Sequence, residues 1–160
     1  MNPVRTEDYE FIRQLVNTEG WLKYIGERNI HSIDASKAYI QKILDSYTID
    51  YWVTYLKETN RPIGMVSLVK RDYLEHFDIG FAFLPEYMGK GYAFEATNAV
   101  LQKLKEATDV TEVLAITIPG NISSIKLLQK LGLEFHKEIE TNDEKLHVYK
   151  GGITPAPKGM

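Results

Sequence analysis

The sequence contains no cysteine. This absence excludes disulfide bonds, thiolate metal ligands and a cysteine nucleophile. Long apolar runs are missing as well, because none approaches the roughly 20 residues of a membrane-spanning helix. The first residues, 1–5, also lack the apolar core of a signal peptide. We therefore expect a cytoplasmic protein with no membrane partner.

An excess of positive charge is missing too. The chain has 19 Lys and Arg residues against 22 Asp and Glu residues, for a formal net charge of -3. No cluster of basic residues offsets this balance, which argues against a nucleic-acid partner. The length of 160 residues suits one domain with a substantial core. The end of the chain from Gly151 on is rich in Gly and Pro, so we place a single domain over residues 1–152 and a frayed tail over residues 153–160.

Apolar periodicity predicts an α+β domain. Helical spacing indicates one helix after Thr6 and a second from about Asp34, with an irregular segment, 20–32, between them. The other predicted elements are strands over 51–58, 63–70 and 75–84, a helix from 92, a strand over 113–118, a helix over 121–131, and a closing hairpin over 133–140 and 145–150. An antiparallel meander followed by a β-α-β crossover indicates a mixed, mainly antiparallel central sheet with flanking helices.

The loop over residues 88–92 is the most informative stretch, since it joins a predicted strand to a predicted helix. Gly89 and Gly91 leave bare backbone at the start of that helix. Free N–H groups there, together with the positive end of the helix dipole, form a site for a phosphate group. Two nucleotide-binding fingerprints fail, because Phe94 replaces the small residue of the dinucleotide motif and no Gly-Lys pair precedes Ser or Thr. On its own the loop is either a phosphate site or a turn that needs glycine dihedral angles.

Two motifs flank the predicted buried strand. The first reads PEYMGKGYAFEA over Pro85–Ala96 and follows Ile79-Gly80-Phe81; the second reads NISSIKLLQKLGL over Asn121–Leu133. At this spacing they resemble the GNAT superfamily of N-acetyltransferases, and more narrowly its RimJ/RimL-like branch. The resemblance covers nearly the whole chain. It implies a GNAT-like acyl-CoA N-acyltransferase fold, acetyl-CoA as co-substrate and no metal.

The resemblance also implies which residues bind coenzyme A. The loop backbone would hold the pyrophosphate, and exposed strand backbone would pair with the pantetheine arm as an added strand does. The implied cofactor-binding residues are Phe81, Phe83, Leu84, Met88, Gly89, Lys90, Gly91, Tyr92, Asn121 and Ser124. Some have plainer alternatives: Asn121 suits a helix N-cap, Ser124 a solvent-facing helix position, and Lys90 an exposed surface.

Acetylation of an amine needs a base and donors that polarise the thioester carbonyl. Asp78 is the candidate base, because relatives often carry Glu at its place in the strand; the alternative is a solvent-facing acid. Strand alternation sets it on the face opposite Phe77. Many GNAT enzymes carry a Tyr that acts as general acid at the position where this chain has Leu128. This leaves the proton donor to the leaving thiolate unassigned. Ser124, near the thioester sulfur by the resemblance, is the second catalytic candidate, and the alternatives are water or no acid at all.

The acceptor site is implied in the first two helices, their connection and the closing hairpin. Its candidate residues are Trp21, Tyr24, Arg28 and His31, with Tyr73 and His147 as further lining residues. The aromatic pair equally suits a core, and Arg28 suits a surface ion pair or an acceptor carboxylate.

These features predict an acetyl-CoA-dependent N-acetyltransferase. The acetyl group would move to a primary amine, of a protein N-terminus or a small molecule, by direct attack in a ternary complex. The enzyme would work as a monomer or homodimer. The alternative is a non-catalytic acyl-CoA-binding module on the same fold.

Overall fold

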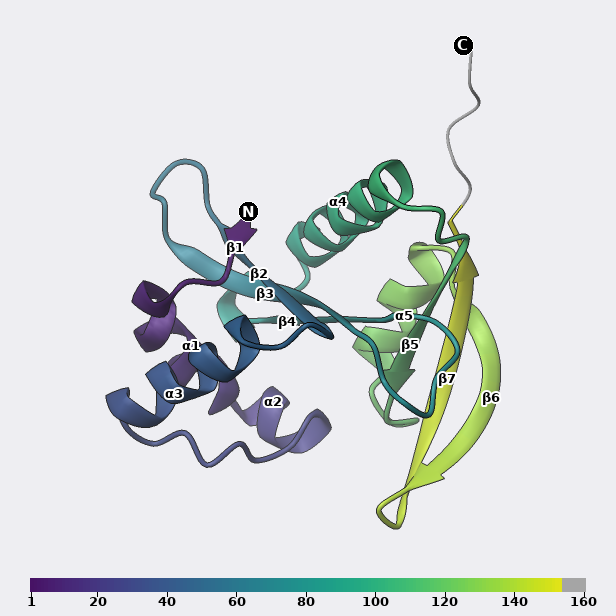
Figure 1. Ribbon diagram of the computed structural model, residues 1–160, viewed down its shortest axis with the longest axis horizontal. Helices are drawn as coiled ribbons and strands as arrows, with labels where there is room; N and C mark the ends of the chain where they lie inside the picture. The colour runs from purple at the N-terminus through teal and green to yellow at the C-terminus, as the bar shows by residue number, and fades with distance from the viewer. Residues whose placement is uncertain (154–160) are drawn as a thin grey trace.

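A seven-stranded sheet with the order β1-β2-β3-β4-β5-β7-β6 organises the chain (Figure 1). The computed structural model describes residues 1–153. The strands are β1 (Asn2–Pro3), β2 (Ile49–Tyr55), β3 (Pro62–Val69), β4 (Asp78–Phe83), β5 (Glu112–Thr117), β6 (Glu134–Thr141) and β7 (Glu144–Gly152). Neighbouring strands are antiparallel except β4 and β5, which run parallel. The predicted mixed, mainly antiparallel sheet is confirmed.

Helices cover both faces of this sheet. They are α1 (Tyr9–Val16), α2 (Glu19–Tyr24), α3 (Ile33–Leu44), α4 (Tyr92–Ala107) and α5 (Ile122–Lys130), with short 3-10 helices η1 (Thr6–Asp8) and η2 (Pro85–Tyr87). In Figure 1, α1 and α3 lie on one side of β2–β4 and α4 lies on the other. The β-α-β crossover through α4 thus separates the meander from the second half of the sheet.

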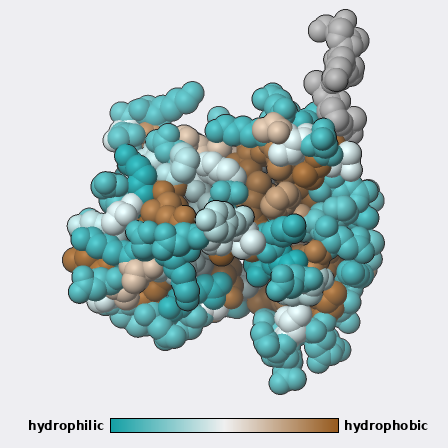
Figure 2. Space-filling model, viewed as in Figure 1, coloured by the Kyte–Doolittle hydropathy of each residue, from teal (hydrophilic) through white to brown (hydrophobic). Residues whose placement is uncertain are grey.

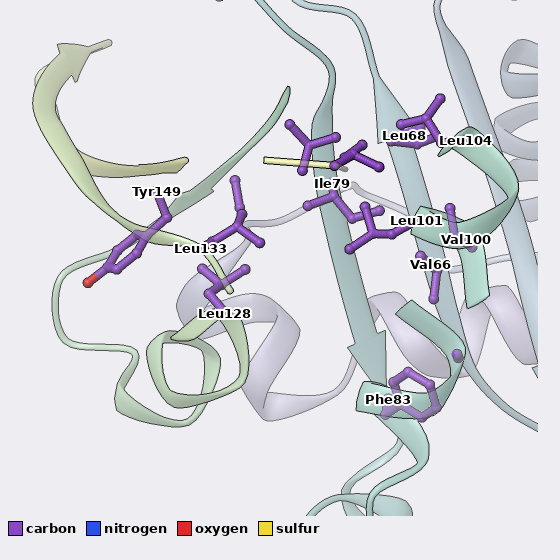
Figure 3. Close-up of a cluster of buried hydrophobic side chains, with 14 of the residues drawn as sticks. Val66, Leu68, Ile79, Phe83, Val100, Leu101, Leu104, Leu128, Leu133 and Tyr149 are labelled. Carbon is purple, nitrogen blue, oxygen red and sulfur yellow. The ribbon is translucent and has the colours of Figure 1, made fainter. Parts of the chain in front are cut away.

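Strand alternation divides the apolar side chains between two cores. The first core joins the sheet to α4 and α5, and its members include Val66, Leu68, Ile79, Phe83, Val100, Leu101, Leu104, Leu128, Leu133 and Tyr149. Figure 3 shows these side chains in two groups, one from β3, β4 and α4 and one from α5, Leu133 and β7. The second core joins the opposite face to α1–α3, and its members include Ile12, Leu15, Trp21, Ile40, Val53, Met65 and Leu84. Each fully buried Leu, Ile or Val contributes about 1.5 to 3 kcal/mol, so both helical layers are firmly held.

The segment predicted as irregular, 20–32, begins with a helix, so that prediction is wrong for its first part. Thr18 caps α2 by accepting a hydrogen bond from the Trp21 N–H at 3.3 Å. Ser32 caps α3 in the same way, accepting from the Ala35 N–H at 3.1 Å. Ser and Thr are preferred N-caps because their oxygens satisfy orphan N–H groups of the first turn.

Residue 153 is part of the packed fold, one position beyond the predicted end of the domain. The closing hairpin turns at Asn142 and Asp143, both with positive φ, as a two-residue type I′ turn requires. Strand β7 then runs to Gly152, and the Ile153 N–H donates to the Thr111 carbonyl at 2.6 Å. The Ile153 side chain is buried in the first core, so the predicted tail boundary at 153 is corrected by one residue. The rest of that tail, 154–160, lies outside the described residues.

Candidate functional site

Strands β4 and β5 pair at one position only. Asp78 is opposite Leu114, and the Leu114 N–H donates to the Phe77 carbonyl at 2.9 Å. Beyond this pair no further register position joins the two strands, although both continue for several residues. In Figure 2, hydrophobic side chains are visible on the surface between α4 and the half of the molecule that carries β5–β7. The sheet is therefore split along the free sides of β4 and β5.

The closed end of the split is held by three polar side chains, Glu112, His76 and Lys150. The Glu112 carboxylate at the start of β5 lies 3.0 Å from His76 Nε2 and 3.0 Å from Lys150 Nζ. These groups come from β5, from the segment before β4, and from β7. The hydrogen bond and charge of Lys150 lower the pKa of Glu112, with His76 adding to the effect. The strands are thus tied at one end and diverge toward the other.

The free side of β4 presents the backbone of alternate residues. The Leu84 N–H donates to the Ile63 carbonyl of β3 at 2.9 Å, so the even-numbered backbone of β4 faces β3. By alternation, the N–H and C=O groups of Phe81 and Phe83 face the split. Leu84 does not, because its carbonyl also accepts from the Tyr87 N–H at 2.9 Å and its side chain is buried. The Leu84 backbone is therefore engaged within the chain, and its contribution to a cofactor site stays a prediction.

Asp78 lies where the two strands separate. Its Oδ2 accepts a hydrogen bond from Arg71 Nε at 2.8 Å, and its Oδ1 accepts from the Ile116 N–H at 3.3 Å. Asp78 is only 6% exposed, so the solvent-facing alternative is wrong for this residue. Burial raises the pKa of Asp78, and the contacts with Arg71 and Ile116 oppose that rise. Both carboxylate oxygens are already occupied within the chain.

The glycine loop opens α4 as an exposed set of donors. Gly89 and Gly91 have φ of 73° and 86°, and a Cβ at either position would meet no atom within 4 Å. Gly91 is the N-cap and has no side chain to satisfy the first turn. Within residues 1–153, the N–H groups of Gly89, Lys90 and Gly91 have no hydrogen-bond acceptor. Donors at the start of a 16-residue helix suit an anion such as a diphosphate.

Met88 differs from the other loop residues. Its N–H donates to the Pro85 carbonyl at 3.2 Å, so this N–H is not a free donor, and the predicted contact of Met88 with the cofactor stays a prediction. Its side chain is exposed, as is that of Lys90, whose Nζ lies 5.9 Å from the centre of the Tyr87 ring. Tyr92 begins α4 and is half-buried against the first core.

Asn121 and Ser124 lie at the start of α5, directly after β5. Asn121 Oδ1 accepts from the Ser124 N–H at 3.4 Å, which is the N-cap arrangement given as the plainer alternative for Asn121. Ser124 is half-buried, unlike the solvent-facing serine of its own alternative. Since β4 and β5 are parallel, α4 and α5 begin beyond the same ends of the two strands. Both helix N-termini therefore belong to the open end of the split.

The structure brings together only part of the predicted acceptor site. Trp21 is buried in the second core, and within residues 1–153 its indole N–H has no partner. The Arg28 guanidinium lies 5.9 Å from the centre of the Trp21 ring. Tyr24 is half-buried below Lys23 Nζ, at 5.0 Å. His31 is separate, because it contacts Glu27 at 2.8 Å and lines a hollow of about 460 Å³ on the outer side of α1.

Of the two further lining residues, Tyr73 is exposed and His147 is half-buried. Tyr73 is an exposed residue of the connection between β3 and β4. His147 of β7 contacts Glu138 of β6 at 3.2 Å and lies against the Phe135 ring, with 4.9 Å between ring centres. His147 is thus occupied within the closing hairpin.

A row of residues beside Asp78 was not predicted from the sequence. Tyr51, Ser67 and Gly80 lie opposite one another on β2, β3 and β4, on the face that carries α1–α3. Ser67 and Gly80 are small, and a Cβ on Gly80 would lie 2.7 Å from Ser67 Oγ. The Tyr51 hydroxyl lies 3.2 Å from the Tyr39 hydroxyl. The feature that identifies this row is the pairing of two small residues, Ser67 and Gly80, across neighbouring strands. This pairing can be recognised only when the register of the strands is known.

Burial and the Tyr39 hydroxyl raise the pKa of Tyr51, while the charges of Arg28 and Arg71 act in the opposite direction. Two cationic side chains thus lie within electrostatic reach of this row.

Among residues 1–153, no helix combines the length and the apolar content that a membrane-spanning segment needs. In the same part of the chain no group of three or more His, Asp or Glu side chains could hold a metal ion.

Comparison with known proteins gives consistent matches. A protein-family model for the acetyltransferase (GNAT) domain matches residues 1–134. The chain is 25% identical over 127 residues to the uncharacterized N-acetyltransferase YnaD of Bacillus subtilis, covering 79% of this chain and 74% of that protein.

Solved structures agree on the fold. The chain is similar to ribosomal-protein-S5-alanine acetyltransferase from Vibrio fischeri, with a TM-score of 0.81 and 20% identity over 98% of this chain and 94% of that one. It is also similar to AAC(6')-Ib in complex with paromomycin and acetyl-CoA, with a TM-score of 0.79 and 16% identity over 94% and 91% of the two chains.

Proposed function

Because the chain belongs to the GNAT acetyltransferase family and is an N-acetyltransferase, we propose that it moves the acetyl group of acetyl-CoA to a primary amine by direct attack in a ternary complex. The observation that carries this proposal is the split beside β4, which ends at the free N–H groups of Gly89, Lys90 and Gly91. Family membership favours an enzyme over the non-catalytic acyl-CoA-binding module. We assign the activity to a single domain over residues 1–152, extended by Ile153.

The donor site that we propose has two parts. The diphosphate binds the N–H groups of Gly89, Lys90, Gly91 and Tyr92, where hydrogen bonds to a charged group contribute about 1.5 to 3 kcal/mol each. The pantetheine arm pairs with the backbone of Phe81 and Phe83 as an added strand. Asn121 and Ser124 line the opposite side at the start of α5. Bound acetyl-CoA supplies an activated thioester, whose carbonyl carbon accepts the amine.

Residues near the thioester then support the transfer. We propose that the Phe83 N–H polarises the carbonyl oxygen, because backbone donors fixed in a strand need little reorganisation. The Ser124 hydroxyl is the candidate donor to the leaving thiolate, either directly or by holding a water. This assignment fits the presence of Leu128 at the position where many relatives carry an acidic Tyr.

The structure changes the role that we propose for Asp78. As a general base it would have to take a proton while Arg71 and Ile116 occupy its oxygens. Because both oxygens are already engaged, we assign deprotonation of the amine to water and give Asp78 a positioning role, developed in the next subsection. The turnover of Asp78→Asn distinguishes the two roles, because a general base needs the ionisable carboxylate whereas the positioning role needs only an oxygen acceptor.

For the acceptor, we propose a site on the α1–α3 face. Its members are Trp21, Arg28 and the row of Tyr51, Ser67 and Gly80. The exposed Arg28 guanidinium is the donor of this site, and Arg suits carboxylate recognition. An N-terminal peptide amine fits such a donor through its carbonyl and carboxylate groups. The likeness to a ribosomal-protein-S5-alanine acetyltransferase, at a TM-score of 0.81, supports the RimJ/RimL-like branch.

A two-stage assay tests this proposal. Calorimetry with the full chain is expected to show binding of acetyl-CoA and no binding of NAD or ATP. Release of CoA thiol is then followed with N-terminal peptides, amino acids, polyamines and an aminoglycoside. We expect peptide amines to give the fastest release, and we expect Arg28→Gln to raise their KM more than that of polyamines. Binding without thiol release from any amine would contradict the transferase proposal.

A further inference from the structure

The hydrogen bond between Asp78 and Ile116 replaces a backbone bond of the sheet. In a parallel ladder, donors of one strand bond to every second carbonyl of the next. The Leu114 N–H bonds to the Phe77 carbonyl at 2.9 Å, so the Ile116 N–H would bond to the Ile79 carbonyl two residues on. Instead it donates to Asp78 Oδ1 at 3.3 Å. The ladder therefore stops at the residue whose side chain takes its next donor.

A carboxylate placed in this way separates the two strands. Paired backbones lie about 4.7 to 4.9 Å apart, and an inserted carboxylate cannot be accommodated at that spacing. The Asp78 side chain is fixed from its other oxygen by Arg71 Nε at 2.8 Å, from the connection that joins β3 to β4. Two directional contacts thus hold the carboxylate between the strands.

The groups left free by this arrangement are those of the proposed donor site. Had the ladder continued, the backbone of Phe81 would be occupied by β5. With the Ile116 N–H diverted, the Phe81 and Phe83 backbone stays open toward the split. The free N–H groups at Gly89 and Gly91 lie beyond the same end of β4.

We propose that Asp78, fixed by Arg71, is a positioning residue that ends the β4–β5 ladder and keeps the backbone of Phe81 and Phe83 free for acetyl-CoA. This role rests on the proposed function for its ligand, but the diverted hydrogen bond itself does not. It requires an oxygen acceptor at position 78 more than a negative charge. A general base, in contrast, requires the ionisable carboxylate and no contact with Ile116.

Two substitutions separate these requirements. Asp78→Asn keeps an oxygen acceptor of the same reach for the Ile116 N–H, whereas Asp78→Ala removes it and leaves Arg71 without its partner. Asp72→Ala, at an exposed acid beside Arg71, is the matched control for loss of a carboxylate in this region. Thermal unfolding of each variant identifies any that fail to fold.

The first measurement is the amide ¹H–¹⁵N signal of Ile116 in the full chain without ligand. We expect its shift and its hydrogen-exchange protection to change strongly in Asp78→Ala, less in Asp78→Asn, and not in Asp72→Ala. An unchanged Ile116 signal in Asp78→Ala would overturn the proposal. This result is independent of enzymatic activity, so it holds even if acetyl-CoA is not the ligand.

The second measurement is acetyl-CoA affinity by calorimetry, with KM and kcat from thiol release. We expect the Kd of Asp78→Ala to rise about tenfold, as for the loss of one hydrogen bond, and that of Asp78→Asn to rise less. Equal Kd values for Asp78→Ala and the wild type would overturn the positioning role. A loss of about 10² to 10⁴ in kcat for both variants at unchanged Kd would overturn it in favour of a base. A wild type that fails to bind acetyl-CoA would instead contradict the proposed function.

Discussion

A glutamate in place of Gly91 would place negative charge where the phosphate is expected. Gly91 is the N-cap of α4, with φ of 86°, and a Cβ there would meet no atom within 4 Å. The new side chain therefore enters open space before the helix and not the core. The cost to the fold is the left-handed backbone of a residue with a side chain, about 1 to 2 kcal/mol.

The effect on binding follows from the charges. A carboxylate about 4 Å from a phosphate repels it by about 1 kcal/mol in water and about 4 kcal/mol at an effective dielectric constant of 20. Each 1.4 kcal/mol is a factor of ten in affinity. We therefore expect Gly91→Glu to raise the Kd for acetyl-CoA by a factor of about 5 to 1,000.

Gly132→Glu is the matched control. Gly132 follows α5, has φ of 93°, and also has no atom within 4 Å of a Cβ. It carries the same backbone cost and the same added charge without facing the glycine loop. Calorimetry at low and high salt measures both variants, since salt weakens repulsion between exposed charges. Wild-type affinity in Gly91→Glu, or equal losses in the two variants, would refute the phosphate site.

Three further predictions concern stability. Gly80→Ala places a Cβ 2.7 Å from Ser67 Oγ. We expect this substitution to lower the melting temperature by about 2 to 4 °C, for a cost of about 1 kcal/mol. Adding Ser67→Ala should restore much of this loss, and a melting temperature that does not recover would contradict the predicted contact. Gly151→Ala brings a Cβ to 2.8 Å from Leu133 Cγ, so we expect about 1 to 3 kcal/mol of destabilisation in urea unfolding, and wild-type stability would contradict it. Burial raises the pKa of Asp78 above its ordinary 3.8. The contribution of this residue to the free energy of unfolding is therefore fully present below about pH 4 and is lost as the pH rises through the pKa of the folded state. Over that rise the wild type should lose more stability than Asp78→Asn, and parallel pH profiles of the two proteins would contradict this.

Local patterns of sequence predicted much of the fold. The closing hairpin and the exposed loop at Gly89 and Gly91 follow from residues close in the chain, because turn and cap positions select particular residue types. Helix α2 was missed because six residues give too little periodicity to detect. Its start depends on one cap, Thr18, within an otherwise irregular composition.

Contacts between residues that are distant in the sequence could not be predicted from it. The position of Asp78 depends on Arg71 returning from the connection before β4 and on Ile116, 38 residues away. No spacing in the sequence encodes where a parallel ladder stops. The backbone direction of Leu84 is likewise set by the register with β3, which no local pattern predicts. Trp21 illustrates a third case, because an aromatic residue at helical spacing suits a pocket and a core equally well.

Amide chemical-shift mapping of acetyl-CoA on ¹⁵N-labelled chain tests the central claim most directly. The account predicts the largest changes at the N–H groups of Gly89, Lys90 and Gly91, with further changes at Phe81 and Phe83. Leu84, whose N–H already donates to Ile63, should change less. An absence of changes, or changes confined to the hollow beside α1, would contradict the claim that the split between β4 and β5 binds the acetyl donor.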